Sequence, residues 1–540
     1  MKRSITLTKT QIVGLVLGIT GFIIPFFITF AGLSFAGHLA LSIFLLAALF
    51  WMTEPIPIYA TSILVIFLGV LLLSGQGPIF QNSELELTEI NAGESGNFLI
   101  PTSAINTKNE IYIYQNGKWI KSLVEIINNQ GDTTEIQSET DLSGIFIATN
   151  YRHKLVGYSP GKSADYMGTL ANPIIILFLG GFMIAEAAVK YNFDKNLTKY
   201  LLKPFGTKPY SILIGLMLVT AGLSAFMSNT ATTAMMMTVI LPILAQLSKG
   251  DYFKTALALS VPISANLGGI ATPIGTPPNA IVLANLNQQG ISISFTDWML
   301  LTVPFVLILL VVSWWILQKM FPTDVESIQI GESKGFNKST KAIAFYGIFS
   351  VTLILWVTES IHGISSTIVA LLPITALALF EVLDVQDIRR LPWEVLWLVA
   401  GGLALGIYLD QTGLADFMVR SIEWNLFSGF MVVSLFGFVA ILLSNFLSNT
   451  VAATLLMPLA ISIGILQGSG ELELIELALV IGVGTSLAMV LPISTPPNAI
   501  AISTGMVKTS EMARSGVLIG IIGLVLMLIY AVLYWPILLT

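Results

Sequence analysis

Two short polar signatures recur in otherwise apolar sequence, and their side chains suit the binding of small ions. One is Ser-Asn-Thr, which occupies residues 228–230 and again 448–450. The other is Thr-Pro-Pro-Asn, which follows each copy at 276–279 and 495–498. The serine lies 48 positions before the threonine in the first copy and 47 before it in the second. Hydroxyl and amide groups donate and accept hydrogen bonds, so such a pair can contact an anion and a cation.

The composition places these signatures in a membrane. Of the 540 residues, 55% are hydrophobic and only 10% are charged, and the mean hydropathy is +0.83. Soluble globular proteins carry about 25% charged residues, so we predict an all-α polytopic membrane protein with no nucleic-acid partner. The chain has no cysteine, which excludes disulfides, thiolate metal sites and a cysteine nucleophile. Its three histidines are scattered, which argues against a histidine metal centre.

Each signature is expected to lie where a helix begins or breaks. A helix that starts at Ser-Asn-Thr offers open backbone N–H groups and the positive end of its dipole to an anion. Side-chain capping of that helix start is the simpler interpretation, and we expect it at both copies. The prolines at 277–278 and 496–497 cannot continue a helical ladder, so the chain must unwind there. A packing kink would explain these prolines, but not Thr276, Asn279 and their counterparts.

Unwound backbone inside a membrane is tolerated only where it is buried in protein or lines a cavity. Its freed carbonyls, together with Ser, Thr and Asn oxygens, suit a small hard cation. The two signatures therefore combine an anion-binding element with a cation-binding one.

Apolar segments of about 20 residues give the predicted order of the spans. The first, 11–33, is longer than the apolar core of a signal peptide (about 7–15 residues) and is interpreted as a membrane helix. Further spans are predicted at 38–52, 57–74, 172–189, 298–318, 342–359, 364–380, 392–409 and 515–538. Hairpin-like stretches at 209–247 and 429–466 carry Ser-Asn-Thr, and broken segments at 255–289 and 474–505 carry Thr-Pro-Pro-Asn.

The second half of the chain repeats the order of the first. Trp51-Met-Thr-Glu54 matches Trp356-Val-Thr-Glu359, and Gly180-Gly181 matches Gly401-Gly402. These two landmarks are 126 residues apart in the first half and 42 in the second, a difference of 84 residues. The difference is close to the length of the polar interval 75–168, which is therefore interpreted as an insertion into one repeat.

The insertion is predicted to be a small β-rich module. The stretches Ile111-Tyr-Ile-Tyr-Gln and Lys118-Trp-Ile-Lys flank Asn116-Gly117, a strong signal for a two-residue hairpin. A second turn is expected at 128–132. We interpret the module as a decorated loop without activity of its own.

Lysine and arginine are distributed unequally between the two sides of the predicted membrane. If both hairpin stretches enter and return on the same side, 18 of the 25 lie on the cytoplasmic side and seven on the other, as the positive-inside bias requires. The signatures then enter from opposite faces, which is the arrangement of two inverted repeats with re-entrant hairpins. We expect a multi-pass plasma-membrane protein (bacterial inner membrane) with a cytoplasmic N-terminus, and with 75–168 and the C-terminus extracytoplasmic.

No Lys or Arg lies inside a predicted span. A dianion bound there cannot be neutralised by a basic side chain, and burying an uncompensated charge is very costly. Helix dipoles and co-bound cations remain, which favours anion transport coupled to Na⁺. Acidic residues near span ends are expected to be solvated or capping groups, with proton coupling by Glu54 or Glu359 as the alternative. These acidic residues are Glu54, Glu186, Glu359 and Glu394.

The paired Ser-Asn-Thr and Thr-Pro motifs resemble those of the divalent anion/sodium symporter (DASS) family of dicarboxylate, citrate and sulfate carriers. The resemblance covers nearly the whole chain except 75–168. It implies substrate contacts from hairpin tips and helix breaks, at Ser228, Asn229, Thr230, Thr276, Pro277, Ser448, Asn449, Thr450, Thr495 and Pro496. It implies one sodium site at Ser224, Ser228, Asn229 and Gly275 and another at Ser444, Ser448, Asn449 and Ser494.

The resemblance also implies a homodimer in which a transport domain moves against a fixed scaffold as an elevator. The segments would be scaffold helices (1–74 and 341–428), the insertion (75–168), a scaffold helix with a cytoplasmic interfacial helix (169–208), a cytoplasmic linker (321–340) and the transport domain (209–320 and 429–540). The expected function is sodium-coupled symport of C4-dicarboxylates (succinate, malate, fumarate) across a lipid bilayer, with Na⁺ co-transported. The alternatives are anion exchange, or sodium-coupled transport of citrate or sulfate by the same fold.

Two other classes of function fit the sequence less well. A membrane enzyme with Ser228 or Ser448 as nucleophile needs a nearby general base, and the spans offer neither serine a His or Lys, so the chain is not expected to be an enzyme. A sensor in which the insertion reports to a partner would need a signalling domain, and the sequence supports none.

Overall fold

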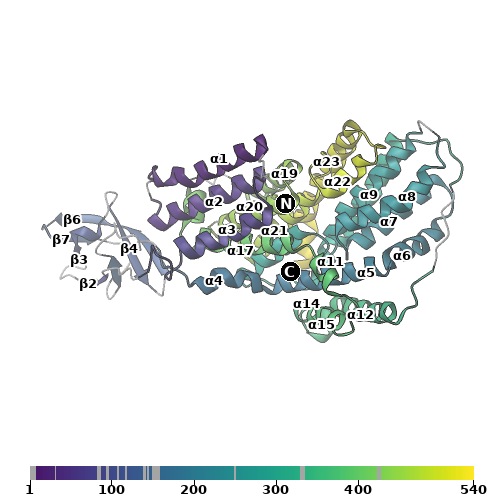
Figure 1. Ribbon diagram of the computed structural model, residues 1–540. Helices are drawn as coiled ribbons and strands as arrows, with labels where there is room; N and C mark the ends of the chain where they lie inside the picture. The colour runs from purple at the N-terminus through teal and green to yellow at the C-terminus, as the bar shows by residue number, and fades with distance from the viewer. Residues whose placement is uncertain are drawn as a thin grey trace. The chain divides into compact units, whose positions relative to one another are not determined.

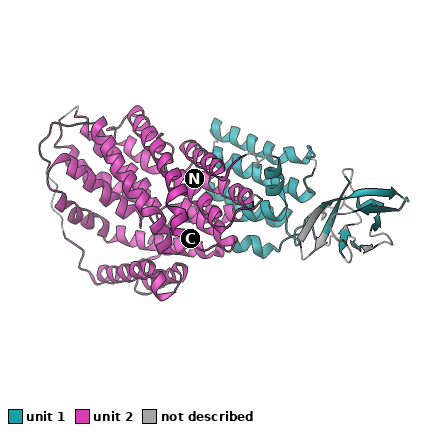
Figure 2. Cartoon of the chain, turned by 180° about the vertical axis from the view of Figure 1, so that it is seen from behind, with its two compact units in different colours: residues 1–169, 404–423 teal, residues 170–403, 424–540 magenta. Residues whose placement is uncertain are grey.

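The computed structural model describes most of the chain (Figure 1). The described residues are 8–30, 32–81, 87–92, 97–105, 109–115, 118–129, 131–137, 142, 145–148, 158–248, 251–328, 335–421, 427–466 and 468–539. Two compact units make up the chain, one of residues 1–169 and 404–423 and the other of residues 170–403 and 424–540 (Figure 2). The boundary falls within helix α17 (Trp393–Gln411).

The first unit begins with the helices α1 (Lys9–Ile23), α2 (Phe35–Thr53) and α3 (Ile58–Leu72). Glycines at 14, 18 and 21 let α1 approach α2 closely, since a Cβ on Gly18 would overlap the Phe50 ring. Helix α1 ends at Ile23 and is followed by a 3₁₀ turn, η1 (Ile24–Phe26). It is shorter than the predicted span 11–33, because Pro25 lacks the N–H that would continue the α-helical ladder.

The insertion in the first unit folds into two four-stranded antiparallel sheets, ordered β1-β8-β4-β5 and β2-β3-β7-β6. The strands are β1 (Leu87–Glu89), β2 (Asn91–Ala92), β3 (Phe98–Pro101), β4 (Glu110–Gln115), β5 (Lys118–Leu123), β6 (Glu125–Asn129), β7 (Thr133–Gln137) and β8 (Phe146–Ala148). The predicted hairpin is confirmed by the pairing of Gln115 with Lys118, and the second turn by the pairing of β6 with β7. The turn residues Asn116-Gly117 themselves lie outside the described residues. Buried isoleucines from both sheets, including Ile100, Ile111 and Ile136, form one small core.

A cluster of tyrosines joins the insertion to the helices of its unit. The hydroxyl of Tyr158 donates to the carbonyl of Leu73, at the end of α3. The ring of Tyr166, in α4 (Ser163–Met167), packs edge-to-face on Tyr408 with centroids 4.9 Å apart, and its hydroxyl donates to Gln411 at 2.9 Å. All three tyrosine side chains are buried. The segment that follows the β sheets is therefore part of the helical core and not of the separable module.

We expect that replacing residues 82–157 by a short Gly/Ser linker leaves the membrane helices folded. The amide of Gly75 donates to the carbonyl of Gly161 at 3.0 Å, so the two ends of the module already lie together. The midpoint of thermal unfolding, followed by far-ultraviolet circular dichroism, should change by no more than about 2–4 °C, which corresponds to roughly 1 kcal/mol. A deletion extended to residue 168 should lower the midpoint further because it removes the tyrosine cluster. Aggregation of the shorter deletion variant would contradict this assignment.

The second unit consists of helices in its described part. They are α5 (Pro173–Lys190), α6 (Phe193–Leu202), α7 (Pro209–Ser224), α8 (Asn229–Leu244), α9 (Phe253–Ile270), α10 (Pro277–Gln288), α11 (Phe295–Met320), α12 (Thr340–Val357), α13 (Glu359–His362), α14 (Ser366–Val369), α15 (Leu371–Leu379), α16 (Val385–Arg389), α19 (Gly429–Phe446), α20 (Asn449–Leu466), α21 (Glu471–Ser486), α22 (Pro496–Ser503), α23 (Thr509–Leu533) and α24 (Trp535–Leu539), with the start of α17. A short helix, α18 (Leu414–Arg420), belongs to the first unit. Within the described ranges, eight helices are long and apolar enough to cross a membrane. The prediction of an all-α polytopic membrane protein with a small β-rich insertion is confirmed.

The hairpins and broken helices of the two halves interleave within the second unit. The hairpin α7–α8 contacts α9, and the hairpin α19–α20 contacts α21. Each shorter half-helix contacts helices of the other copy: α10 contacts α20 and α21, whereas α22 contacts α8 and α9. Close approach is helped by Gly482 in α21, where a Cβ would lie 2.8 Å from Val282 of α10. The two signatures are therefore parts of one helical core.

Two of the acidic residues near span ends, Glu359 and Glu186, have structural partners. The carboxylate of Glu359 accepts from the amide of Phe295 at 2.9 Å and from that of Ser366 at 3.1 Å, so it caps the starts of α11 and α14. Glu186, in α5, forms an ion pair with Arg390 at 3.6 Å. These contacts favour the structural interpretation of both residues. A proton on Glu359 would weaken its carboxylate as the acceptor of these amide hydrogen bonds.

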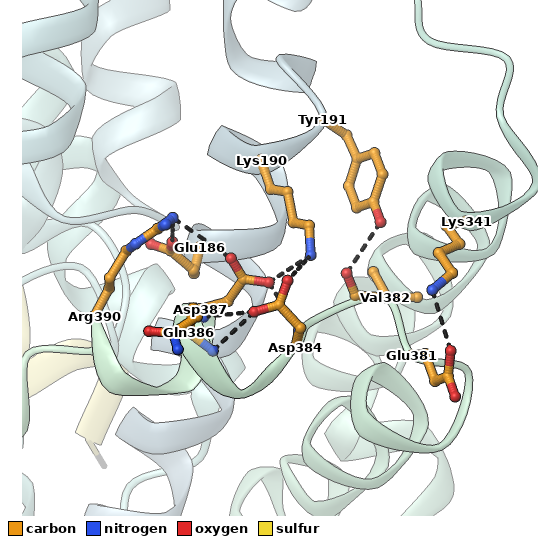
Figure 3. A network of polar contacts seen from close by, with 10 residues as sticks. All are labelled: Glu186, Lys190, Tyr191, Lys341, Glu381, Val382, Asp384, Gln386, Asp387 and Arg390. Carbon is orange, nitrogen blue, oxygen red and sulfur yellow. Dashed lines mark hydrogen bonds and ion pairs between the residues drawn. The ribbon is translucent and has the colours of Figure 1, made fainter.

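An ion-pair network anchors the end of α5 to the turn before α16 (Figure 3). The ammonium of Lys190 lies 2.5 Å from Asp387 and 3.1 Å from Asp384, and Arg390 lies 3.5 Å from the other oxygen of Asp387. The amide of Asp387 and the ammonium of Lys190 lower the pKa of Asp384 to about 2. The hydroxyl of Tyr191 donates to the carbonyl of Val382 at 3.0 Å. These contacts hold Lys190 and Tyr191 in place, just before the start of α6.

Candidate functional site

The first hairpin tip brings Ser224, Asn229 and the helix break after α9 together. Ser224 is the last residue of α7 and is fully buried, and its hydroxyl donates to the carbonyl of Ala265 at 2.9 Å. One terminal atom of the Asn229 amide lies 2.6 Å from Ser224 Oγ and 3.2 Å from the carbonyl oxygens of Ala265 and Gly275. With its nitrogen turned inward, the amide donates to all three oxygens. With its oxygen turned inward, it accepts from Ser224 and completes a cluster of four oxygens.

The second hairpin tip repeats this arrangement at the same spacings. The hydroxyl of Ser444 donates to Asn449 Oδ1 at 2.8 Å and to the carbonyl of Thr485 at 2.6 Å. As in the first copy, the asparagine lies five residues and the carbonyl 41 residues beyond the serine. Both Ser444 and Asn449 are buried. The sequence match between the copies is thus accompanied by a match in side-chain contacts.

Each helix break is held open by the asparagine of Thr-Pro-Pro-Asn. The Asn279 amide donates to the carbonyls of Gly269 at 2.9 Å and Thr272 at 2.7 Å. In the second copy, the Asn498 amide donates to the corresponding carbonyls, of Ala488 at 3.4 Å and Leu491 at 3.0 Å. These bonds satisfy carbonyls that the interrupted helices leave without partners. The asparagines therefore stabilise the unwound segments.

The unwound residues precede the prolines, which differs from the prediction that the chain unwinds at them. Helix α9 ends at Ile270 and α10 begins at Pro277, while α21 ends at Ser486 and α22 begins at Pro496. A proline is tolerated in the first turn of a helix because no intrahelical acceptor exists for an N–H there. Pro277 and Pro496 therefore start the second half-helices, and Pro277 is less exposed than Pro496.

The two copies differ in which hydroxyl donates to the carbonyl of the residue that follows Ser224 or Ser444. In the first copy, Thr272 donates to the carbonyl of Ala225. In the second, Ser494 donates to the carbonyl of Asn445 at 2.8 Å. Gly275 is the counterpart of Ser494 and has no hydroxyl. The donating hydroxyl of the first copy is instead that of Thr272, three positions earlier. Ser494 therefore contacts Asn445, whereas Gly275 contacts the asparagine of the tip.

Side-chain capping of the helix starts is found in the second copy only. Ser448 accepts from the amide of Val451 at 3.3 Å, and Thr495 accepts from that of Asn498 at 3.3 Å. Ser228 and Thr276 make no such bond among the described residues. The prediction of capping at both copies is therefore wrong for the first one. The N–H groups at the start of α8 are correspondingly open to a ligand. At the start of α10, Pro277 and Pro278 have no N–H, and the amide of Asn279 donates to the carbonyl of Thr276 at 3.1 Å. Thr230 is exposed and Thr450 partly exposed at the same ends.

Two residues that the sequence analysis did not single out connect the signatures. Asn266 donates to Thr495 Oγ1 and to Asn498 Oδ1, at 3.3 Å each, and so joins α9 to the second break. Gly269 lies between Asn229 and Thr276, since a Cβ there would be 2.7 Å from the Asn229 amide and 3.1 Å from Thr276 Cβ. The sequence signals that could have identified them are Asn266, a polar residue in the apolar run 253–270, and the glycine pair Gly268-Gly269 in the same run.

We expect Gly269→Ala to be destabilising by about 1–3 kcal/mol, because the new methyl group would overlap the Asn229 amide. Gly222→Ala is the matched control, since Gly222 also lies in a helix but has no atom within 4 Å of its missing Cβ. That control should be neutral or stabilising, by up to about 1 kcal/mol. Thermal unfolding of both variants in detergent tests this, and equal midpoints would contradict the close packing around Gly269.

Hydroxyl, amide and backbone groups thus build both copies of the site. Comparison with known proteins places the chain in a family. The family model described as citrate transporter, CitMHS, matches residues 154–484 and 353–539. An uncharacterized transporter of Haemophilus influenzae is 34% identical over 386 residues, which cover 68% of this chain and 82% of that protein. The chain belongs to the citrate transporter family.

Other relatives of this citrate transporter family member have more specific names. A sodium-dependent dicarboxylate transporter, SdcS, of Staphylococcus saprophyticus is 28% identical over 405 residues, covering 68% of this chain and 76% of the relative. SdcS of Staphylococcus aureus is 27% identical over 410 residues. Among solved structures, the Alcanivorax borkumensis YdaH transporter aligns with a TM-score of 0.46 and 11% identity over 76% of this chain and 93% of that one. The predicted membership of the DASS-type dicarboxylate carriers is confirmed, and the chain is a multi-pass membrane transporter.

Proposed function

We propose that the chain is a sodium-coupled symporter of C4-dicarboxylates. The observation that carries this proposal is the oxygen cluster at Asn229, repeated around Asn449. Hard cations are bound by carboxylate, carbonyl and amide oxygens, and this cluster contains no basic group that would repel one. The relatives named sodium-dependent dicarboxylate transporter agree with the same ion and substrate class.

The first sodium ion would be held by Ser224, Ser228, Asn229 and Gly275, and the second by Ser444, Ser448, Asn449 and Ser494. At the first site, three protein oxygens already surround one terminal atom of Asn229 within 3.2 Å. At the second site, the hydroxyl of Ser494 donates its hydrogen to the carbonyl of Asn445, which leaves the lone pairs of its oxygen available to a cation.

The dicarboxylate would bind at the helix starts next to these ions. Ser228, Asn229, Thr230, Thr276 and Pro277 would contact one end of it, and Ser448, Asn449, Thr450, Thr495 and Pro496 the other. Support comes from the uncapped start of α8, whose open N–H groups favour an anion, and from the dipoles of α8 and α10. A dianion among neutral side chains needs compensating cations, so substrate and sodium should bind together.

The orientation of the Asn229 amide provides a coupling mechanism. With its nitrogen turned inward, the amide donates to Ser224 and to the two carbonyls, and this orientation would belong to the sodium-free site. A sodium ion requires the amide oxygen to point inward, which turns the nitrogen outward, where it can donate to a substrate carboxylate. Each ligand then stabilises the arrangement that the other one needs, which is reciprocal linkage. Movement of residues 209–320 and 429–540 as one transport domain, in a homodimer, would carry both ligands across.

Radiolabelled succinate uptake into proteoliposomes tests this function. We expect uptake with an inward sodium gradient and loss of nearly all of it when sodium is replaced by potassium or choline. Because at least two cations must accompany a dianion, a third would make uptake electrogenic and faster with a negative interior. Full uptake without sodium, driven by an opposing dicarboxylate gradient, would instead establish the exchanger. Sodium-dependent uptake of citrate or sulfate but not of succinate would reassign the substrate.

A further inference from the structure

An apolar groove runs alongside the first hairpin and is lined by none of the residues proposed to bind sodium or substrate. It has a volume of about 440 Å³ and is lined only by apolar side chains and one glycine. Its walls come from α5, α6, α7 and α12 and from the residues just before the tip. They include Leu197 and Leu201 of α6, Leu223 and Phe226 of the hairpin, and Phe349 and Leu353 of α12. All of these elements belong to the second unit.

No side chain of the described residues fills this groove. Gly222 belongs to the lining, and no atom lies within 4 Å of the position where its Cβ would be. Leu201 is 40% exposed although it lies on the lined face. The groove is as large as pockets that bind small molecules (about 300–1,000 Å³). An apolar molecule of the bilayer is therefore the natural occupant.

Helix α6 adds a basic surface to this apolar one. Its groove-facing residues recur every four positions, at 193, 197 and 201, whereas lysines follow at 195, 199 and 203. Successive helical positions are 100° apart, so these lysines lie on a different face from the lining residues. Lys195, Lys203 and Lys208 are exposed. A basic amphipathic helix of this kind attracts anionic lipids.

We propose that the groove binds one acyl chain of an anionic phospholipid whose headgroup is held by Lys203 and Lys208, which flank the lining residue Phe205 in the turn after α6. The hydrocarbon would replace the missing side-chain volume at Gly222 and cover Leu201. The phosphate would lie near the exposed ammonium groups, which a zwitterionic lipid would engage less well. The site is separate from the sodium and dicarboxylate sites, so its occupancy does not depend on the substrate being identified correctly.

Photolabelling of the full-length protein with a phosphatidylglycerol that carries a diazirine in one acyl chain tests the proposal. Peptides are then analysed by mass spectrometry, with a phosphatidylcholine of the same chain as the comparison probe. We expect labelling of α7 and α12 at groove residues, higher with the anionic probe by about fivefold or more, the factor expected from about 1 kcal/mol for one lysine near a charged surface. Excess unlabelled phosphatidylglycerol should compete, and phosphatidylcholine should not.

Gly222→Phe should remove the groove label because the ring occupies the open space. Gly347→Phe is the control, since Gly347 is an exposed glycine of α12 that also has open space around it but does not line the groove. If the first variant fails to fold, competition on the unaltered protein decides. Equal labelling by both probes, label spread evenly over all lipid-facing helices, or undiminished label in folded Gly222→Phe would overturn the proposal.

Discussion

Replacing Asn229 by alanine is expected to weaken sodium activation and dicarboxylate uptake together, by roughly 10- to 100-fold each. The estimate takes about 1.5–3 kcal/mol for each hydrogen bond or contact to a charged group. The amide is the only side chain of the first tip that reaches Ser224 and the carbonyls of Ala265 and Gly275 among the described residues. Asn449→Ala should act in the same direction, since Asn449 makes the same contact with Ser444.

Asn229→Asp separates the two roles of the amide. A carboxylate retains an oxygen for the sodium ion but has no N–H to donate to a substrate carboxylate. It should therefore preserve or increase sodium affinity while dicarboxylate uptake is lost. Sodium binding is measured by the sodium dependence of thermal stability, and substrate binding by uptake at saturating sodium.

The matched control for both variants is Asn285→Ala. Asn285 is also a buried asparagine of the second unit, but its amide donates within its own helix, to the carbonyl of Ile281 at 2.7 Å. This control should leave the sodium dependence of uptake unchanged. If Asn229→Ala retained the sodium dependence of the parent protein, or if Asn285→Ala lost it equally, the oxygen cluster would not be the coupling site.

The sequence alone predicted that helices are interrupted at the two signatures because this depends on local chemistry, although the unwound residues precede the prolines. Ser-Asn-Thr starts helices at 229 and 449, and proline starts them at 277 and 496. The alternation in the insertion and its Asn-Gly dipeptide likewise predicted the β4–β5 hairpin. These features follow from which backbone groups a residue can supply or block, and they need no knowledge of distant neighbours.

Contacts between the copies could not be predicted in this way. Asn266 reaches Thr495 and Asn498 across more than two hundred residues of sequence, and nothing local distinguishes it from another buried asparagine. The unequal capping of the two copies also depends on tertiary contacts, because the tip sequences are nearly identical. The predicted span 11–33 was too long, because the apolar sequence continues beyond Ile23, where α1 ends.

Thr276→Val and Thr495→Val are expected to have the same effect on uptake but, because of the unequal capping, different effects on stability. Each substitution removes a hydroxyl proposed to contact a substrate carboxylate, so each should raise the KM for succinate by roughly tenfold or more, from a bond of about 1.5–3 kcal/mol. Sodium activation should change less, because neither hydroxyl is one of the proposed sodium ligands. Uptake against succinate concentration at fixed sodium measures the first effect, and uptake against sodium concentration the second.

Stability should distinguish the two variants. Thr276 caps no amide among the described residues, so Thr276→Val should unfold at nearly the parent temperature. Thr495 accepts from the amide of Asn498 and from the side chain of Asn266, at 3.3 Å each, and its loss leaves two buried donors without an acceptor. Thr495→Val should therefore also lose about 1–3 kcal/mol of unfolding free energy. Thr495→Ser keeps the oxygen and should restore both stability and KM, whereas equal stability of the two valine variants would show that the hydrogen bonds of Thr495 do not hold the second break.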